Sequence, residues 1–413
     1  MKMNSALRGV VGVLVALAMA ACASNRDARG RGQGSDSREG AGRAGHLLII
    51  GGGLDDDNRP VYDRLIELAR HSAGSAREPR ILIATAASLD QEANSKGKTE
   101  SILAYCPTCR IDTITRETPT EETVALVDAA DAMFFTGGDQ KRITARYLKD
   151  DADTPESLAM RRLLARGGTI AGTSAGDAMM SDPMFLTGRS AEALGIRSTR
   201  TSKGPDDDAD EKSTRPPLGP RIGKGMGFLP WAITDSHFFE RHRFGRLVAA
   251  LETSGTRLGI GVGEDACVEV DLATGDLIGV SVADSLLVDA GGVRRDGLSR
   301  SNLRALVIQQ GARVSLLARL ESSIPQPPPR PDATEDHPIV EPGQNRQLAS
   351  WRFFLRAQQD TSTVNQSTEH RPTPDHPATA QHLQLDGYNQ TAWPDGTGWS
   401  IVEITPATNH ADH

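Results

Sequence analysis

The sequence predicts an α/β fold, a doubly wound and mostly parallel sheet with helices on both faces. From His46 onward, short apolar runs alternate with amphipathic stretches. The runs are continuously apolar, which is typical of strands covered on both faces. Gly172-Thr173-Ser174-Ala175-Gly176 then joins one such run to a helix that begins with small residues, which predicts a strand-to-helix turn. In folds of this kind, ligands gather at the carboxyl ends of the strands.

The expected elements alternate along the chain. Strands are expected at His46–Ile50, Arg80–Thr85, Arg110–Ile114, Ala132–Thr136 and Thr169–Gly172. Helices are expected at Val61–His71, Glu92–Tyr105, Glu121–Ala129, Lys141–Lys149 and Glu156–Ala165. After a break, structure is expected to resume with Phe228–Thr234, a helix at Glu240–Leu251, and strands near Leu258–Val262, Cys267–Val270, Leu277–Val282 and Ala312–Leu317.

The N-terminus predicts export. Lys2 and Arg8 precede the apolar run Val10–Ala21, which is too short for a membrane span. The small residues before Cys22 resemble a bacterial lipoprotein cleavage box, in which the cysteine is lipidated. An ordinary signal peptide cut nearby is the alternative. Because Ala23 is not an aspartate, we expect an extracytoplasmic protein anchored to the outer rather than the inner membrane.

The segments outside the α/β region differ from it in composition. The expected organisation is a signal peptide at 1–21, a flexible lipidated tether at 22–45, the α/β domain at 46–320 with a solvated acidic insertion at 198–220, a proline-rich linker at 321–350, and an extension at 351–413. Two strands are expected in the extension, at Trp351–Leu355 and Gly398–Ile404. The sequence does not tell what the extension does.

Charge and cysteine content limit the partners. The net charge is −8, and cleavage before Cys22 would make it −10, which argues against nucleic acid. Cys106 and Cys109 have no second pair for a zinc site, so a local disulfide is expected, with a redox role as the alternative. Cys267 lies in an apolar strand and is expected in the core. The acids of the insertion lack calcium-loop spacing. No metal or cofactor is expected.

Ser174 is the candidate nucleophile, because small residues around it permit a tight turn that exposes its hydroxyl. The N–H of Ala175 would then point toward an oxyanion. A plain glycine-rich turn is the alternative. A serine nucleophile needs a base. Most of the ten histidines lie in the linker, the tail, a strand start or a helix end, which leaves His237 and His242. His237 is favoured because Asp235-Ser236-His237-Phe238 lies where a strand gives way to a helix.

Two further strand ends supply polar groups. Glu264 is the first polar residue beyond the apolar run that ends at Gly263, so it is a candidate to orient His237, with Asp265 as its local rival. After the fourth strand, the Gly-Gly pair that includes Gly138 lets backbone N–H groups approach an oxyanion. Gln140 is a candidate to hold a substrate amide. From spacing alone, this segment is equally a tight turn between strand and helix.

Arg241, Arg243 and Arg246 follow the candidate base within the expected helix. Positions 243 and 246 share a helix face. A solvated basic face with ordinary salt bridges is one interpretation. The other is a cluster that binds carboxylates, because guanidinium groups grip planar anions through two hydrogen bonds. Closeness to His237 favours the second interpretation.

Four segments in this order and spacing resemble cyanophycinase, a serine peptidase related to the aspartyl dipeptidases. They are Phe135-Thr136-Gly137-Gly138-Asp139-Gln140, Gly172–Gly176, Asp235–Phe238 with the three arginines and Leu247, and Gly259–Glu264. The resemblance covers roughly residues 46–320. It implies a class I glutamine amidotransferase-like fold, Ser174 as nucleophile, His237 as base and Glu264 as third member. It also implies that Gln140 and the arginines line the substrate pocket, and that a homodimer forms.

By this resemblance, the expected substrate is cyanophycin, a polyaspartate with arginine on each β-carboxyl, which is released as β-aspartyl-arginine dipeptides. The sequence departs from the family at Ser236, where Gln is usual, and at Asp177, where Ala is common. An aspartate there would repel an anionic substrate or favour a different one. Two alternatives stay open: an aspartyl or isoaspartyl dipeptidase acting on short peptides, and a non-catalytic binding lipoprotein.

Overall fold

The computed structural model describes residues 44–196, 219–324, 326–327, 330, 334–337, 354, 380–385, 388–395, 397 and 399–407. They all belong to one compact unit that spans 42–413. The expected signal peptide, Cys22, and almost all of the tether and the acidic insertion lie outside the described residues. So do most of the linker and parts of the extension, including most of the expected strand 351–355. Within the described stretches, no helix is long and apolar enough to cross a bilayer.

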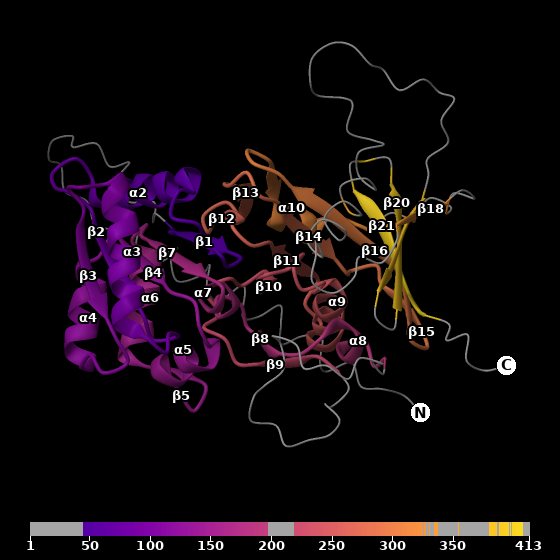
Figure 1. Ribbon diagram of the computed structural model, residues 1–413, viewed down its shortest axis with the longest axis horizontal. Coiled ribbons are helices and arrows are strands. Elements are labelled where there is room, and N and C mark those ends of the chain that lie inside the picture. Colours follow the sequence, from indigo (N-terminus) through magenta and orange to yellow (C-terminus); the bar gives the residue numbers. More distant parts are fainter. Residues whose placement is uncertain are drawn as a thin grey trace, which may run out of the picture. The chain divides into compact units, whose positions relative to one another are not determined.

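Five parallel strands form the centre of the first sheet, in the spatial order β1, β7, β4, β2, β3. They are β1 (His46–Ile50), β2 (Arg80–Ala84), β3 (Arg110–Ile114), β4 (Ala132–Phe135) and β7 (Thr169–Thr173). These bounds lie within a residue of the predicted ones. The predicted α/β fold is therefore confirmed (Figure 1).

Helices cover both faces of this sheet. On one face, α2 (Arg59–Ala73) and α3 (Gln91–Tyr105) pack against alternate strand residues such as Leu48 and Ile50. On the other face, Leu47 and Ile49 join a second core cluster. The helices on that side are α4 (Thr120–Ala129), α5 (Gln140–Tyr147) and α6 (Pro155–Ala165). Strand side chains point to opposite faces in turn, so strands that are apolar throughout need this double cover.

Antiparallel strands extend the first sheet beyond β1. They are β12 (Cys267–Asp271), β13 (Asp276–Gly279) and β17 (Arg313–Ser315). Cys267 is buried in β12, as predicted. Cys106 and Cys109 form a disulfide with an S–S distance of 2.03 Å, which agrees with the local disulfide expected from their spacing. Two short ribbons lie off the sheet, formed by β5 (Leu148–Lys149) with β6 (Ala152–Asp153) and by β8 (Met184–Thr187) with β9 (Arg221–Gly223).

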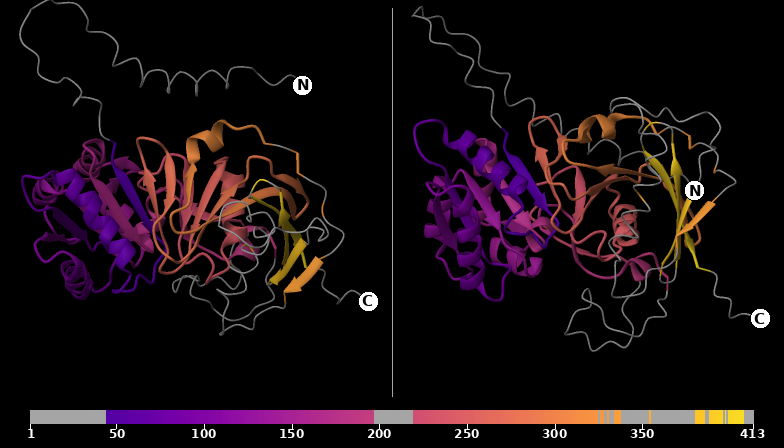
Figure 2. Two further views of the ribbon diagram at one scale, coloured as in Figure 1. Left: turned by 90° about the horizontal axis from the view of Figure 1, so that it is seen from above. Right: turned by 45° about the horizontal axis from the view of Figure 1, so that its top comes forward.

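A second sheet, which the sequence did not predict, begins with β10 (Ala232–Asp235) and β11 (Leu258–Val262), which run parallel. Antiparallel strands β14 (Ser285–Asp289) and β16 (Ser299–Ile308) follow, and β15 (Arg294–Asp296) pairs with β16. The chain's last strands complete this sheet (Figure 2). They are β21 (Ser400–Pro406), β20 (Tyr388–Pro394), β19 (Ala380–Leu385) and β18 (Thr334–His337).

Helix α9 (Phe244–Ser254) packs on the second sheet, with α8 (Ser190–Ala193) beside it and α10 (Leu316–Glu321) near β13. The expected helix from Glu240 was too long at its start. His237 and His242 both have positive φ, +46° and +49°. A right-handed helix cannot contain such residues, so the segment before Phe244 forms a compact turn.

Candidate active site

Ser174 lies where β7 ends and α7 (Ala175–Ala178) begins, with φ at +56°. This backbone conformation is strained for a residue with a side chain, and such strain is typical of a serine on a strand-to-helix elbow. The flanking glycines permit it. A methyl group on Gly172 would lie 2.3 Å from the carbonyl oxygen of Gly176, and one on Gly176 would lie 2.7 Å from that of Phe135. Only hydrogen fits at either position, and the turn therefore keeps its shape.

The loop after β1 ties together the three turns that carry the candidate triad. The N–H of Ser174 donates to the carbonyl of Ile50 at 3.0 Å, and that of His237 donates to Gly51 at 2.7 Å. The N–H of Asp265 donates to Gly52 at 2.8 Å. Three successive carbonyls thus align residues that lie far apart in the sequence. We did not single out this loop from the sequence, although its three glycines at the carboxyl end of a strand were a usable signal.

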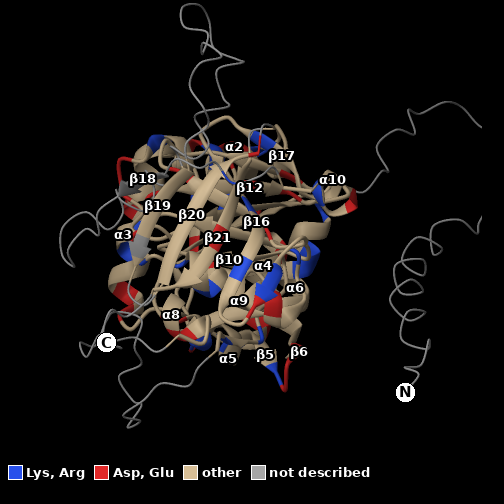
Figure 3. Ribbon diagram, turned by 90° about the vertical axis from the view of Figure 1, so that its right-hand side faces the viewer, with Lys and Arg blue, Asp and Glu red and all other residues tan. Residues whose placement is uncertain are grey.

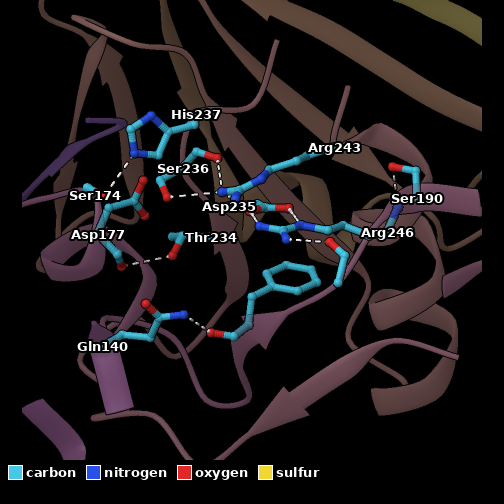
Figure 4. Close-up of polar contacts among 12 residues, drawn as sticks. Gln140, Ser174, Asp177, Ser190, Thr234, Asp235, Ser236, His237, Arg243 and Arg246 are labelled. Atoms are coloured by element: carbon cyan, nitrogen blue, oxygen red, sulfur yellow. Dashed lines mark hydrogen bonds and ion pairs between the residues drawn. The ribbon is translucent and has the colours of Figure 1, made fainter. Parts of the chain in front are cut away.

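Ser174, His237 and Glu264 form a continuous chain of hydrogen bonds. Ser174 Oγ lies 2.8 Å from His237 Nε2. A dashed line marks this contact in Figure 4. His237 Nδ1 lies 2.7 Å from Glu264 Oε1. A neutral imidazole that donates from Nδ1 to the carboxylate leaves Nε2 to accept the serine proton. The structure therefore brings the three predicted residues together in the predicted order.

The surroundings of His237 keep it neutral. Burial, reinforced by the guanidinium groups of Arg241 and Arg243, lowers the pKa of His237 from 6.5 to about 4, although Glu264 acts in the opposite direction. An imidazole that is unprotonated at neutral pH is ready to accept a proton.

The local rivals of the triad residues have other contacts. Asp265 Oδ1 accepts hydrogen bonds from the N–H of Asp55 at 3.0 Å and from Asn58 Nδ2 at 2.7 Å. This carboxylate ties the Glu264 turn to the start of α2. The backbone carbonyl of His242 accepts a hydrogen bond from Ser190 Oγ at 2.6 Å. Asp265 thus holds the turn that presents Glu264, and His242 contributes to the contact between α8 and α9.

Arg243 and Arg246 share a buried carboxylate, Asp235. Arg246 contacts both of its oxygens, with Nη2 at 2.5 Å and Nε at 2.8 Å. Arg243 Nη1 donates to the backbone carbonyl of Ser236 at 2.6 Å and lies 3.4 Å from Asp235. These two arginines form salt bridges, as the first interpretation expected, but they are buried and do not lie on a solvated face. Asp235 is a residue whose part in the site the sequence did not reveal.

The three arginines nevertheless line the same pocket as Ser174, a cavity of about 180 Å³. Gly138 and Ala175, the candidate oxyanion donors, also line it. Gly138 has a φ of +141°, and a methyl group on it would lie 2.2 Å from the carbonyl oxygen of Ala87. Gln140 Nε2 donates to the carbonyls of Phe185 and Leu186, at 2.7 and 2.9 Å, so its amide nitrogen holds the pocket wall.

The described residues contain no group of three or more His, Cys, Asp or Glu side chains that could hold a metal ion.

A sequence profile described as peptidase family S51 matches residues 47–278, more than half of the 413-residue chain.

The chain belongs to peptidase family S51.

Among curated proteins, this S51 member resembles the cyanophycinase of Trichormus variabilis, at 36% identity over 145 residues. That match covers 35% of this chain and 40% of the relative. The cyanophycinase of Geminocystis herdmanii is 35% identical over 142 residues, which is 34% of this chain and 43% of the relative. That of Synechococcus elongatus is 32% identical over 148 residues, or 36% and 38%. The chain thus spans less than half the length of the curated relatives it matches.

Two solved structures are also similar to the chain. One is a peptidase from an acI-B1 Actinobacterium, with a TM-score of 0.47 and 16% identity, covering 66% of this chain and 97% of that one. The other is a putative peptidase E protein from Listeria monocytogenes, with a TM-score of 0.37 and 10% identity, covering 58% and 100%.

Asp177 and Ser236, the two expected departures from the family pattern, lie beside Ser174 and His237 in this S51 protein (Figure 4). Asp177 has no exposed surface, and no described group hydrogen-bonds to either of its carboxyl oxygens. Burial raises the pKa of Asp177 well above its ordinary range and so favours the neutral carboxyl. Thr234 Oγ1 donates a hydrogen bond to the backbone carbonyl of Asp177 at 3.0 Å. Asp177 therefore lies behind the pocket, without the exposed charge that would repel an anionic substrate, whereas Ser236 lines the pocket itself.

Proposed function

We propose that this S51 member is a serine-type peptidase with Ser174, His237 and Glu264 as its catalytic triad. The observation that carries the proposal is the pair of hydrogen bonds of 2.8 and 2.7 Å that joins the three side chains. The low pKa of His237 supports it, because the base must be unprotonated before the reaction begins.

In the proposed mechanism, Ser174 Oγ attacks the scissile carbonyl carbon while His237 Nε2 takes the hydroxyl proton. Backbone N–H groups of Gly138 and Ala175 stabilise the resulting oxyanion, and loss of one such donor typically costs about 3 kcal/mol in barrier. His237 then gives its proton to the leaving amine, and the C–N bond breaks to leave an acyl-enzyme. A water molecule, deprotonated by His237, releases the second product and restores Ser174. Glu264 stabilises the imidazolium in both halves.

For the substrate we propose cyanophycin, cleaved as an exopeptidase would to β-aspartyl-arginine dipeptides. The similarity to curated cyanophycinases supports this choice. The pocket is consistent with it, because Arg241, Arg243 and Arg246 line its wall and guanidinium groups bind carboxylates. In cyanophycin the β-carboxyls are in amide bonds, and the free carboxylates are those of the attached arginines and of the chain end.

A second candidate is an aspartyl or isoaspartyl dipeptidase that acts on short peptides. The observation that favours it is the cavity volume of about 180 Å³. Ligand pockets typically enclose about 300–1,000 Å³, so a short substrate fits this site more readily than a polymer.

We also propose that the mature protein is an extracytoplasmic lipoprotein attached to a membrane through Cys22. The apolar run and the small residues before that cysteine support this proposal. Metabolic labelling with a fatty-acid analogue tests this proposal. We expect label on the wild-type protein and none on Cys22→Ser, and label on both would contradict it.

Incubation of purified protein with insoluble cyanophycin tests the enzymatic proposal. Wild type should clear the suspension and release β-aspartyl-arginine, identified by mass, whereas Ser174→Ala should do neither. If folded wild type leaves the polymer intact but hydrolyses β-aspartyl dipeptides, the second candidate replaces the first. If it hydrolyses neither, both enzymatic proposals are wrong and a binding role becomes the hypothesis to test.

A further inference from the structure

Phe354, from the extension at 351–413, contacts the turn that carries His237. Phe354, which is buried, lies with its ring centroid 5.0 Å from that of Phe244 and 6.5 Å from that of Phe239. Phe244 opens α9, and Phe239 lies two residues after the candidate base. A side chain from outside the S51 match, which ends at residue 278, therefore packs against the turn after His237 and against the start of α9.

The ring of Phe239 continues this contact toward the triad. It meets the Phe238 ring edge-on, with centroids 5.4 Å apart. A methyl group added to Gly263, the residue before Glu264, would lie 3.0 Å from Phe239 Cδ2. One added to Gly261 would lie 2.4 Å from Phe238 Cδ2. The two aromatic rings thus fill the space between the turn that carries His237 and the strand that leads to Glu264.

The backbone at His237 needs such support. Its φ of +46° is rarely adopted by residues with side chains. A strained conformation of this kind costs about 1–3 kcal/mol and persists only where the surrounding structure imposes it. Loss of packing around the turn would let His237 relax toward an ordinary conformation and move its ring away from Ser174.

Strands β20 and β21 also pack against these aromatic rings, through the side chains on one face of the second sheet. Tyr388 and Ala392 of β20 and Val402 and Ile404 of β21 belong to the core cluster that includes Phe239, Phe244 and Phe354. Trp393, on the opposite face of β20, belongs to a separate cluster with Ala380 and Ile401. Figure 3 shows β19, β20, β21 and β16 side by side in the sheet that carries these residues.

We propose that the C-terminal segment, meaning Phe354 together with β19, β20 and β21, is part of the catalytic unit. In this proposal, Phe354 is a positioning residue that holds the His237 turn against Ser174 and Glu264. The proposal rests on the proposed serine mechanism. It assigns a role to the extension whose purpose the sequence did not disclose.

The test uses the full chain with Phe354→Ala, Phe354→Leu and the control Trp393→Ala. The control removes a buried aromatic side chain from the same segment but from the other face of the sheet. A fluorophosphonate probe reacts with an activated serine whatever the natural substrate is, so its rate of reaction with Ser174 reports how well His237 is placed. Each variant is measured well below its own Tm.

Phe354→Ala should label at least about tenfold more slowly than wild type, because a misplacement of about 1 Å at a catalytic group can cost on the order of 100-fold. Phe354→Leu, which restores most of the packing, should recover much of the rate, and Trp393→Ala should lower Tm with little change in labelling. If Phe354→Ala labels like Trp393→Ala, the positioning role is wrong and the segment only stabilises the fold. Where Phe354→Ala does not fold, Phe354→Val, which also leaves a gap beside Phe239 and Phe244, takes its place with the same two outcomes. If wild type does not label at Ser174, the serine mechanism fails and this inference fails with it.

Discussion

Gly52 lies against the candidate base and offers a sharp test of the site's geometry. It has a φ of +107°, and a methyl group there would lie 2.3 Å from His237 Cε1 and 2.5 Å from Nε2. Ordinary van der Waals contact begins at 3.4 Å. In Gly52→Ala, the imidazole must therefore retreat by about 1.1 Å, or the loop must shift by as much.

Such a displacement is too large for the hydrogen bond of 2.8 Å between Ser174 and His237 to survive unchanged. We expect the rate of the chemical step to fall on the order of 100-fold, which corresponds to about 3 kcal/mol in barrier. Steady-state hydrolysis gives kcat and KM, and thermal unfolding shows that the variant is folded.

Gly74→Ala is the matched control. Gly74 also has a positive φ, +70°, but no atom lies within 4 Å of a methyl group added there. Both variants should lose stability through backbone strain, by about 1 kcal/mol or more. Only Gly52→Ala should lose activity. A Gly52→Ala variant with wild-type kcat would refute the inferred position of His237.

Three further outcomes follow from the site. Glu264→Gln should lower kcat by about a thousandfold or more, because a neutral amide cannot stabilise the imidazolium. Asp265→Asn should mainly lower Tm, and equal losses of kcat in the two variants would refute the triad assignment. The acid limb of kcat/KM should fall near the His237 pKa of about 4, because only neutral imidazole accepts the serine proton, and a limb at 6.5 would contradict this. Because the pKa of Asp177 is raised in the folded protein, its contribution to stability is present at acidic pH and is lost as the pH rises. Asp177→Asn should therefore raise Tm more at about pH 8 than at about pH 4. A gain in Tm that does not depend on pH would contradict the raised pKa.

The parallel half of the first sheet was predictable because its strands are short apolar runs with turn residues between them. Strand β16 was not predictable, because its sequence Ser299–Ile308 contains arginines, and arginine side chains are usually exposed to solvent. In the structure they are buried in ion pairs with acids from distant elements, Arg300 with Glu252 and Arg304 with Asp395. Such pairing is set by tertiary contacts, and no local pattern reveals it.

The same reason limits what the sequence tells about the site. Ser174, His237 and Glu264 each follow a strand, so each was a candidate from its motif. The ends of β7 in the first sheet and of β10 and β11 in the second sheet bring them together. The contacts of Phe354 with Phe239 and Phe244, by contrast, join residues across a long stretch of chain. Spacing along the sequence contains no information about such contacts.

Covalent labelling followed by peptide mapping tests the central claim, that Ser174 is a nucleophile activated by His237, most directly. Wild-type protein treated with a fluorophosphonate should gain one adduct, and that adduct should map to Ser174. His237→Ala should react far more slowly at the same residue. An adduct on a different serine, or peptide hydrolysis by a Ser174→Ala variant at the wild-type rate, would contradict the account.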